Sequence, residues 1–248
     1  MLAEKLWHEG SYAAAVAEYE RVIQKDEMSE LGTMATYRSA ITQTLFLNEH
    51  AAAIKKFSRI IDLHRESPLA YESYKQIGDI LFQKLEQYEQ AYSHYQRMLQ
   101  VYPSEPHRAE IRFRMAKCLF HLVRLPEAKL AFEAIVKEFP DSEWAEKADF
   151  EVGIILVADG NRTQSQDTKA ANLKFKDAMQ KFSDFQKKFP NSALKTQAQF
   201  EIGGIYEELE QLDAAQKAYE ELKSTYPQPN LVELKLKRIQ DRKRQKNL

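Results

Sequence analysis

Apolar and polar residues alternate with helical periodicity along the chain, and the clearest block of this pattern spans residues 192–227. The apolar positions of its first half are Ala198, Phe200, Ile202, Gly203 and Tyr206. Those of its second half, after a polar turn at Glu210 and Gln211, are Leu212, Ala215, Tyr219 and Leu222. Tyr226 and Pro227 end the block. The pattern predicts two amphipathic helices joined by a short turn and closed by proline.

The same pattern predicts six two-helix units, of which the first two match it least well. The predicted units are residues 1–27, 28–67, 68–103, 104–140, 141–190 and 191–227. Pro103 and Pro140 are 37 residues apart, as are Pro190 and Pro227, and this spacing sets the repeat length. Unit 1–27 keeps the second-helix pattern, but only about ten residues precede it. We therefore expect the chain to begin inside a repeat, as a trimmed or processed product.

The unit 141–190 is longer than the others. Pro140 and Pro190 are 50 residues apart, and the surplus of 13 residues falls at about 158–172, between the two helices. This segment has the sequence ADGNRTQSQDTKAAN and lacks apolar periodicity. It predicts an inserted loop exposed to solvent, or a frayed extension of the flanking helices, and a binding role for this loop stays open.

The C-terminal segment 228–248 predicts a basic capping helix. It places Val232, Leu236 and Ile239 on one helical face, and residues 231–248 carry seven Lys and Arg against Glu233 and Asp241. A terminal helix has to cover the apolar face of the last repeat while showing a polar face to water. Attraction to an acidic partner is the alternative, and salt-sensitive binding lost on deletion of residues 240–248 would support it.

Composition favours an all-helical, water-soluble protein. The 248 residues include only 7 Gly and 8 Pro, too few for the turns of a β-rich fold, so we expect almost no strand. The 36 Lys and Arg nearly balance the 37 Asp and Glu, which gives no field that would attract nucleic acid. No apolar run approaches the roughly 18 residues of a membrane span, and the start has no signal-peptide pattern.

Motifs for catalysis or metal binding are missing from the sequence. The six His never form an HExxH motif, and there is neither a glycine-rich phosphate loop nor a GxSxG motif. Cys118 is the single cysteine, which excludes an intramolecular disulfide and a cysteine-based zinc site. We therefore expect no catalytic residue, no cofactor, no metal site and no small-molecule substrate.

The units resemble tetratricopeptide repeats. The matching positions are Gly78, Ala91, Tyr95 and Pro103; Ala116, Ala128, Phe132 and Pro140; Gly153, Ala178, Phe182 and Pro190; and Gly203, Ala215, Tyr219 and Pro227. The small residues Gly78, Ala116, Gly153 and Gly203 are expected to let the paired helices approach closely. The resemblance implies an all-α tetratricopeptide solenoid over residues 1–248, a right-handed superhelix of antiparallel helix pairs ending in the capping helix. It also implies a scaffold for a protein or peptide partner. Packing of a second copy on the incomplete first unit stays open.

A narrower resemblance concerns the repeat junctions. The sequences FPDS at 139–142 and FPNS at 189–192 are each followed by Ala-x-Phe-x-aliphatic-Gly. This combination is similar to the repeats of bacterial envelope proteins of the BamD and YbgF (CpoB) type. The similarity implies a periplasmic or outer-membrane-associated scaffold. A cytoplasmic adaptor and an accessory or regulatory subunit of an envelope enzyme are the alternatives.

The tetratricopeptide resemblance also implies that the first helices line a concave groove for the partner. The candidate partner-binding residues are Phe113, Lys117, Phe120, His121, Phe150, Ile154, Val157, Phe200 and Glu207. An apolar strip containing Phe113, Phe150 and Phe200, flanked by charge, would suit an extended or helical peptide. The alternative is that these Phe residues thicken the core between helices. In that case alanine substitutions at Phe113 and Phe150 would unfold the protein rather than abolish binding alone.

Overall fold

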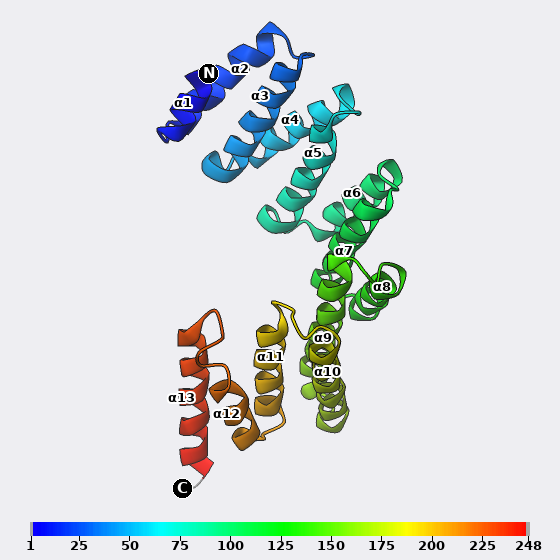
Figure 1. Ribbon diagram of the computed structural model, residues 1–248, viewed down its shortest axis with the longest axis vertical. Coiled ribbons are helices and arrows are strands. Elements are labelled where there is room, and N and C mark those ends of the chain that lie inside the picture. Colours follow the sequence, from blue (N-terminus) through cyan, green and yellow to red (C-terminus); the bar gives the residue numbers. More distant parts are fainter. Residues whose placement is uncertain (1, 247–248) are drawn as a thin grey trace. The chain divides into compact units, whose positions relative to one another are not determined.

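The computed structural model describes residues 2–246, and all regular elements among them are helices (Figure 1). The first helices of the pairs are α1 (Leu2–His8), α3 (Glu30–Thr42), α5 (Pro68–Asp79), α7 (Glu105–His121), α9 (Glu143–Gln164) and α11 (Lys195–Glu208). The second helices are α2 (Tyr12–Lys25), α4 (His50–Leu63), α6 (Tyr88–Val101), α8 (Leu125–Glu138), α10 (Thr168–Lys188) and α12 (Leu212–Glu220). The short π-helices η1 (Gln43–Leu47) and η2 (Ile80–Lys84) extend α3 and α5, and α13 (Pro229–Lys246) follows the last pair. The all-α prediction is confirmed.

The helices form two compact units, and the boundary between the units lies after Leu122. The first unit holds α1–α7, and the second holds α8–α13. The boundary falls between the two helices of the predicted repeat 104–140. A single domain over residues 1–248 stays a prediction.

Serine and proline residues start several first helices. The Ser29 and Ser142 hydroxyls accept hydrogen bonds from the backbone N–H groups of Gly32 and Ala145, at 3.0 and 3.2 Å. These contacts satisfy donors that have no partner within the helix. Pro68 occupies the start of α5, where a missing N–H costs nothing.

One residue with positive φ lies in the turn of every helix pair except the fifth. These residues are Gly10, Asn48, Glu86, Val123 and Glu210. From Gly10 to Val123 they follow one another at intervals of 37 or 38 residues, which is the repeat length inferred from the prolines. The backbone geometry of the turns therefore supports the same repeat boundaries.

We expect Val123→Gly to stabilise the protein by about 1 kcal/mol. Val123 has φ of 60°, a conformation that costs a β-branched residue about 1–2 kcal/mol, and its side chain is 57% exposed, so little burial is lost. Urea unfolding followed by circular dichroism measures the change. The control is Val101→Gly, an exposed position at the end of α6, where glycine should destabilise. Equal losses of stability in both variants would contradict the expectation.

In three helix pairs, the first helix has a glycine that packs against an aromatic ring of the second helix. A Cβ added at Gly78 would lie 2.3 Å from the Tyr95 ring, and one at Gly153 would lie 2.6 Å from the Phe182 ring. The same distance from Gly203 to Tyr219 is 2.8 Å. No side chain fits in these positions without displacing a buried ring. The expected role of Gly78, Gly153 and Gly203 in close helix packing is confirmed.

The segment 158–172 is an ordered extension of its two flanking helices. The prediction of an exposed loop is wrong, and the alternative of a helix extension is correct except that the extension is not frayed. Helices α9 and α10 are 22 and 21 residues long, and only residues 165–167 join them. Asp167 caps α10, since its Oδ1 accepts a hydrogen bond from the Ala170 N–H at 2.9 Å. Lys174 bridges the two helices through Asp159 and Thr163, at 2.8 Å each. The surplus residues therefore lengthen both helices by about two turns in an ordered way.

A second glycine–aromatic contact explains why the extension is ordered. A Cβ at Gly160 would lie 2.6 Å from the Phe175 ring, which is fully buried, and Ala171 is also fully buried. Gly160 follows Gly153 by seven residues, and Phe175 precedes Phe182 by seven. The glycine–aromatic contact is thus repeated seven residues further along each helix of the pair. Gly160 and Ala171 are too small to register as apolar periodicity, so the sequence pattern suggested a loop.

Tyrosine, a carboxylate and a cation form a recurrent link between one helix pair and the next first helix. The three triads are Tyr19–Glu4–Arg38, Tyr95–Asp79–Arg114 and Tyr219–Glu207–Arg238. In each triad the arginine follows the tyrosine by 19 residues. The corresponding positions after Phe57, Phe132 and Phe182 are Gln76, Glu151 and Glu201. The arginine therefore accompanies the tyrosine hydroxyl, because the hydroxyl holds the carboxylate that the arginine needs.

Helix α13 covers the apolar end of the second unit. Val232, Leu236 and Ile239 are buried and pack with Tyr219 and Leu222. The cations on the helix are largely paired within the chain. They contact Glu207, Glu210 and Asp213 through Lys235, Arg238, Arg242 and Lys243. Much of the basic charge therefore attaches the helix to its own repeat.

Candidate functional site

The two phenylalanines of the predicted aromatic strip that lie in the second unit both pack against other rings. Phe150 is only 5% exposed, and its ring packs 5.4 Å from that of Phe182 and 5.7 Å from that of Phe185. Phe200 stacks on Tyr226 at 4.6 Å and contacts the edge of Tyr219. Phe150 is therefore covered by α10, whereas Phe200 is half-buried, and a binding role for these two rings stays a prediction.

Glu207 is also a structural residue rather than a binding residue. Its carboxylate is 4% exposed and accepts hydrogen bonds from the Tyr219 hydroxyl at 2.9 Å and from Lys235 at 2.8 Å. Ile154 and Val157 are half-buried against the core that contains Phe150. A binding role for Ile154 and Val157 stays a prediction.

The remaining candidates lie together on α7 in the first unit. Lys117 lies over the Phe120 ring, with Nζ 5.4 Å from the ring centroid. His121 stacks on Tyr88 at 4.7 Å at the end of the helix, and Phe113 is half-buried nearer its middle. A binding role for Phe113, Lys117, Phe120 and His121 stays a prediction. The nine candidates thus divide between the two units.

An apolar pocket that the sequence did not suggest lies on the first helices of the first unit. It has a volume of about 340 Å³ and opens between α1, α3 and α5. Its lining residues are Trp7, Tyr19, Met34, Tyr37, Arg38, Ile41, Thr42 and Leu69. Arg38 is held at its edge by an ion pair of 2.7 Å with Glu4. The pocket is therefore an apolar recess with its one lining cation already neutralised.

A second pocket of about 430 Å³ adjoins the first. Its lining residues are Met28, Glu30, Thr33, Met34, His64, Ser67, Pro68 and Leu69. Met34 and Leu69 line both pockets and so form a shared wall. Met28, Leu31 and Met34 are 62%, 52% and 40% exposed. We call the two pockets together with Leu31 the apolar face; such a concentration of exposed apolar side chains marks an interaction site.

The sequence carried a weak signal for this face. Leu31, Met34 and Ile41 have helical spacing and lie beside the core stripe that contains Tyr37. A second stripe on one helix predicts a second contact. The signal fell in the repeat 28–67, where the match to the repeat pattern is weakest, and was therefore missed.

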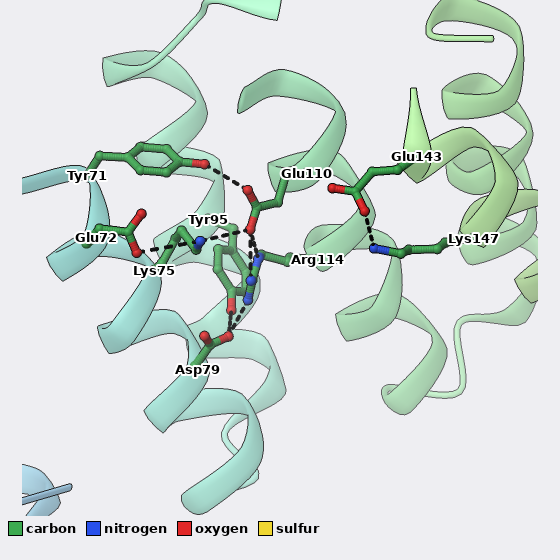
Figure 2. Close-up of polar contacts among 9 residues, drawn as sticks. All are labelled: Tyr71, Glu72, Lys75, Asp79, Tyr95, Glu110, Arg114, Glu143 and Lys147. Carbon is green, nitrogen blue, oxygen red and sulfur yellow. Dashed lines mark hydrogen bonds and ion pairs between the residues drawn. The ribbon is translucent and has the colours of Figure 1, made fainter. Parts of the chain in front are cut away.

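A network of charged side chains joins α5 and α7 (Figure 2). Lys75 Nζ lies 3.6 Å from Glu72 and 3.4 Å from Glu110, and Arg114 contacts both Glu110 and Asp79. Burial would raise the pKa of Glu110, but the Arg114 guanidinium beside it lowers that pKa overall. Two cations thus serve three carboxylates in this network.

Glu72 connects the network to the apolar face. Burial raises the pKa of Tyr37, and the negative charge of Glu72 raises it further. Tyr37 lines the first pocket, and Glu72 follows the pocket-lining Leu69 by three residues on α5, which places both on one face of that helix. Its side chain is 41% exposed, which leaves it accessible to a ligand.

Groups suited to chemistry are not gathered in the described part of the chain. Burial raises the pKa of the Cys118 thiol to about 12, which keeps it protonated and poorly nucleophilic at neutral pH. Residues 2–246 contain no group of three or more His, Cys, Asp or Glu side chains placed to hold a metal ion. None of the helices in this range combines the length and apolar character needed to cross a membrane.

Comparison with known proteins identifies the family. Residues 72–231 match the family model YfiO, described as outer membrane lipoprotein, which covers well over half of the 248 residues. The chain belongs to the YfiO family. The YfiO match begins after Leu69, so the residues that line both pockets precede the matched segment. A comparison with curated proteins finds no match.

Solved structures support the fold of this YfiO-family chain. PilW, described as a type IV pilus biogenesis factor, has a TM-score of 0.59 and 17% identity, covering 96% of this chain and 94% of its own. PilF of Pseudomonas aeruginosa has a TM-score of 0.57 and 14% identity, covering 97% and 94%. YrrB, described as a TPR protein with an unusual peptide-binding site, has a TM-score of 0.50 and 15% identity, covering 86% and 95%. The predicted tetratricopeptide solenoid and the resemblance to BamD-type envelope proteins are confirmed, and with them the general role of a protein-interaction scaffold.

Proposed function

We propose that this protein binds a segment of a protein partner on the apolar face of its first unit, as a scaffold in the bacterial cell envelope. The observation that carries the proposal is the pair of adjoining pockets with Met34 and Leu69 between them. Two adjacent recesses suit two side chains of one extended or helical segment. The peptide-binding site named for YrrB and the pilus role named for PilW are compatible with this kind of function.

The free energy expected from filling the two pockets is too small for tight binding of a partner segment. Burial of one Leu, Met or Phe side chain contributes about 1.5–3 kcal/mol, so two anchors supply about 3–6 kcal/mol. Association of two molecules costs at least about 4 kcal/mol. The apolar contacts therefore offset the cost of association without giving tight binding, and the surrounding charges have to contribute.

Envelope localisation is the second part of the proposal, and the family description as outer membrane lipoprotein supports it. Fractionation of cells that produce the natural protein tests this part. Recovery with the periplasm or outer membrane is expected. Recovery only with the cytoplasm would contradict the envelope role and favour a cytoplasmic adaptor, while leaving the binding site untouched.

Leu69→Asp should abolish partner binding without unfolding the first unit. The aspartate would place a charge in the wall shared by both pockets, where burial against an apolar ligand is strongly unfavourable. Binding is measured by photo-crosslinking from residue 34 in cells, and folding by circular dichroism. The control crosslinker is at Leu173, which is 63% exposed on α10. Identical adducts from residues 34 and 173, or adducts that persist in Leu69→Asp, would contradict the proposed site.

A further inference from the structure

We infer that the segment bound on the apolar face carries a lysine or arginine beside its apolar anchors. This inference rests on the proposed function and specifies the chemistry of the partner. It comes from the charged side chains around the two pockets, where negative charge exceeds positive charge. The residues that line the pockets all precede residue 72, where the match to the family model begins.

Glu30 provides the first uncompensated negative charge. It lines the second pocket in the first turn of α3, and its side chain is exposed. It makes no ion pair within residues 2–246. The neighbouring cation Arg59 is engaged in a bidentate contact with Glu27, at 2.7 and 2.8 Å.

The network on α5 and α7 provides the second negative charge. Its carboxylates are Glu72, Asp79 and Glu110, and its cations are Lys75 and Arg114. Three negative charges against two positive charges leave one negative charge. Glu72 is the member with the weakest pairing, because its contact with Lys75 is 3.6 Å long and Lys75 is shared with Glu110. The excess charge is therefore most available at Glu72, beside the first pocket.

Among the residues that line the two pockets, Arg38 is the one arginine and none is a lysine. Arg38 lines the first pocket, but its guanidinium is 2.7 Å from Glu4. His64 lines the second pocket beside Glu30 and Ser67. The face thus presents two apolar pockets, with Glu30 at one and Glu72 beside the other. A ligand with a Glu or Asp at these places would be repelled, whereas Lys or Arg would be attracted.

Trp7 allows a direct test, because it lines the first pocket and the chain has only two tryptophans. Trp144→Phe removes the other tryptophan, which lies on α9 in the second unit. The probes are four synthetic peptides with the same length. The first has two leucines four residues apart flanked by lysines, and the second has glutamates in place of the lysines. The third keeps the lysines and has serines in place of the leucines, and the fourth, neutral peptide keeps the leucines and has glutamines in place of the lysines. Titration of Trp7 fluorescence gives a dissociation constant for each peptide.

The lysine peptide should bind about tenfold more tightly than the glutamate peptide at low salt, since it gains attraction where the other meets repulsion. The ratio should fall to about twofold in 1 M salt, where the Debye length is about 3 Å. The serine peptide should leave Trp7 emission unchanged. In the double variant Glu30→Gln/Glu72→Gln, the lysine preference should fall below about threefold, while a neutral leucine peptide binds as before. The control Glu133→Gln/Glu208→Gln makes the same change in net charge at exposed positions of the second unit and should keep the preference.

The outcomes separate the inference from the proposed function. Equal binding of the lysine and glutamate peptides, or tighter binding of the glutamate peptide, overturns the inference and leaves the proposed site intact. Loss of the neutral peptide's binding in Glu30→Gln/Glu72→Gln also overturns it, because the two acids would then hold the pockets in shape. A change of Trp7 emission with protein concentration, accompanied by dimers in solution, identifies a second copy as the occupant and overturns it as well. If no leucine peptide changes Trp7 emission, the proposed function itself fails.

Discussion

Phe175→Ala should lower the free energy of unfolding by about 3–5 kcal/mol, the range for removing a large buried aromatic side chain. Phe175 is fully buried, and its ring fills the space above Gly160 in the lengthened part of α9 and α10. The substitution would leave a cavity between the two helices, where the ring now packs against Gly160. Urea unfolding and hydrogen exchange of α9 and α10 measure the effect.

The control for this prediction lies two residues away on the same helix. Leu173 is 63% exposed, so Leu173→Ala should change stability by no more than about 0.5 kcal/mol. If the two variants lost similar small amounts, the extension would behave as the solvent-exposed loop that the sequence suggested. A large loss confined to Phe175→Ala would establish that the surplus residues form part of the core.

Glu207→Ala should cost about 3 kcal/mol and release α13 from the second unit. The carboxylate is buried, accepts the Tyr219 hydroxyl and Lys235, and also lies within 4 Å of Arg238 and Arg242. Its removal leaves a buried hydroxyl without an acceptor, which costs about 1–3 kcal/mol, and cations without a counter-charge. The cations can turn partly towards water, so the loss should stay at the low end of the 3–5 kcal/mol seen for broken buried pairs, about 3 kcal/mol.

Hydrogen exchange resolves where this stability is lost. Protection should fall in α13 and α12 while α9 and α10 keep theirs, because the carboxylate joins α11 to α13. Glu208→Ala is the matched control, since Glu208 is exposed and has only a 3.4 Å contact with Gln164. Retained protection of α13 in Glu207→Ala would contradict the view that this triad attaches the terminal helix.

The repeat architecture was largely predictable from sequence because its determinants are large side chains at fixed spacing. Gly153 and Phe182 lie where the pattern placed them, and Val232 and Leu236 are buried as an apolar stripe requires. The lengthened pair was missed because small residues produce most of its close packing. Gly160 has no side chain to register in an apolar pattern, although it determines how closely α9 approaches α10.

The binding surface was less predictable, because periodicity cannot tell an apolar residue that packs on its own chain from one that faces a ligand. Phe150 and Phe200 have the spacing of a binding strip, but the rings of Phe182 and Tyr226 cover them. Met34 and Leu69 come from different helices, and only the fold brings them together as one wall. Likewise, only the fold shows that the carboxylates of Glu30 and Glu72 lie beside these pockets.

The seven-residue step between the two glycine–aromatic contacts limits how the fifth helix pair can change in length. Seven residues are close to two helical turns, so a gain of seven on each helix returns the glycine and the ring to the same side and the same level. A gain of two or three residues would rotate one partner away from the other and leave a void. We therefore expect insertions and deletions in this helix pair to come in steps of seven residues on each helix. Each such step adds or removes one complete glycine–aromatic contact.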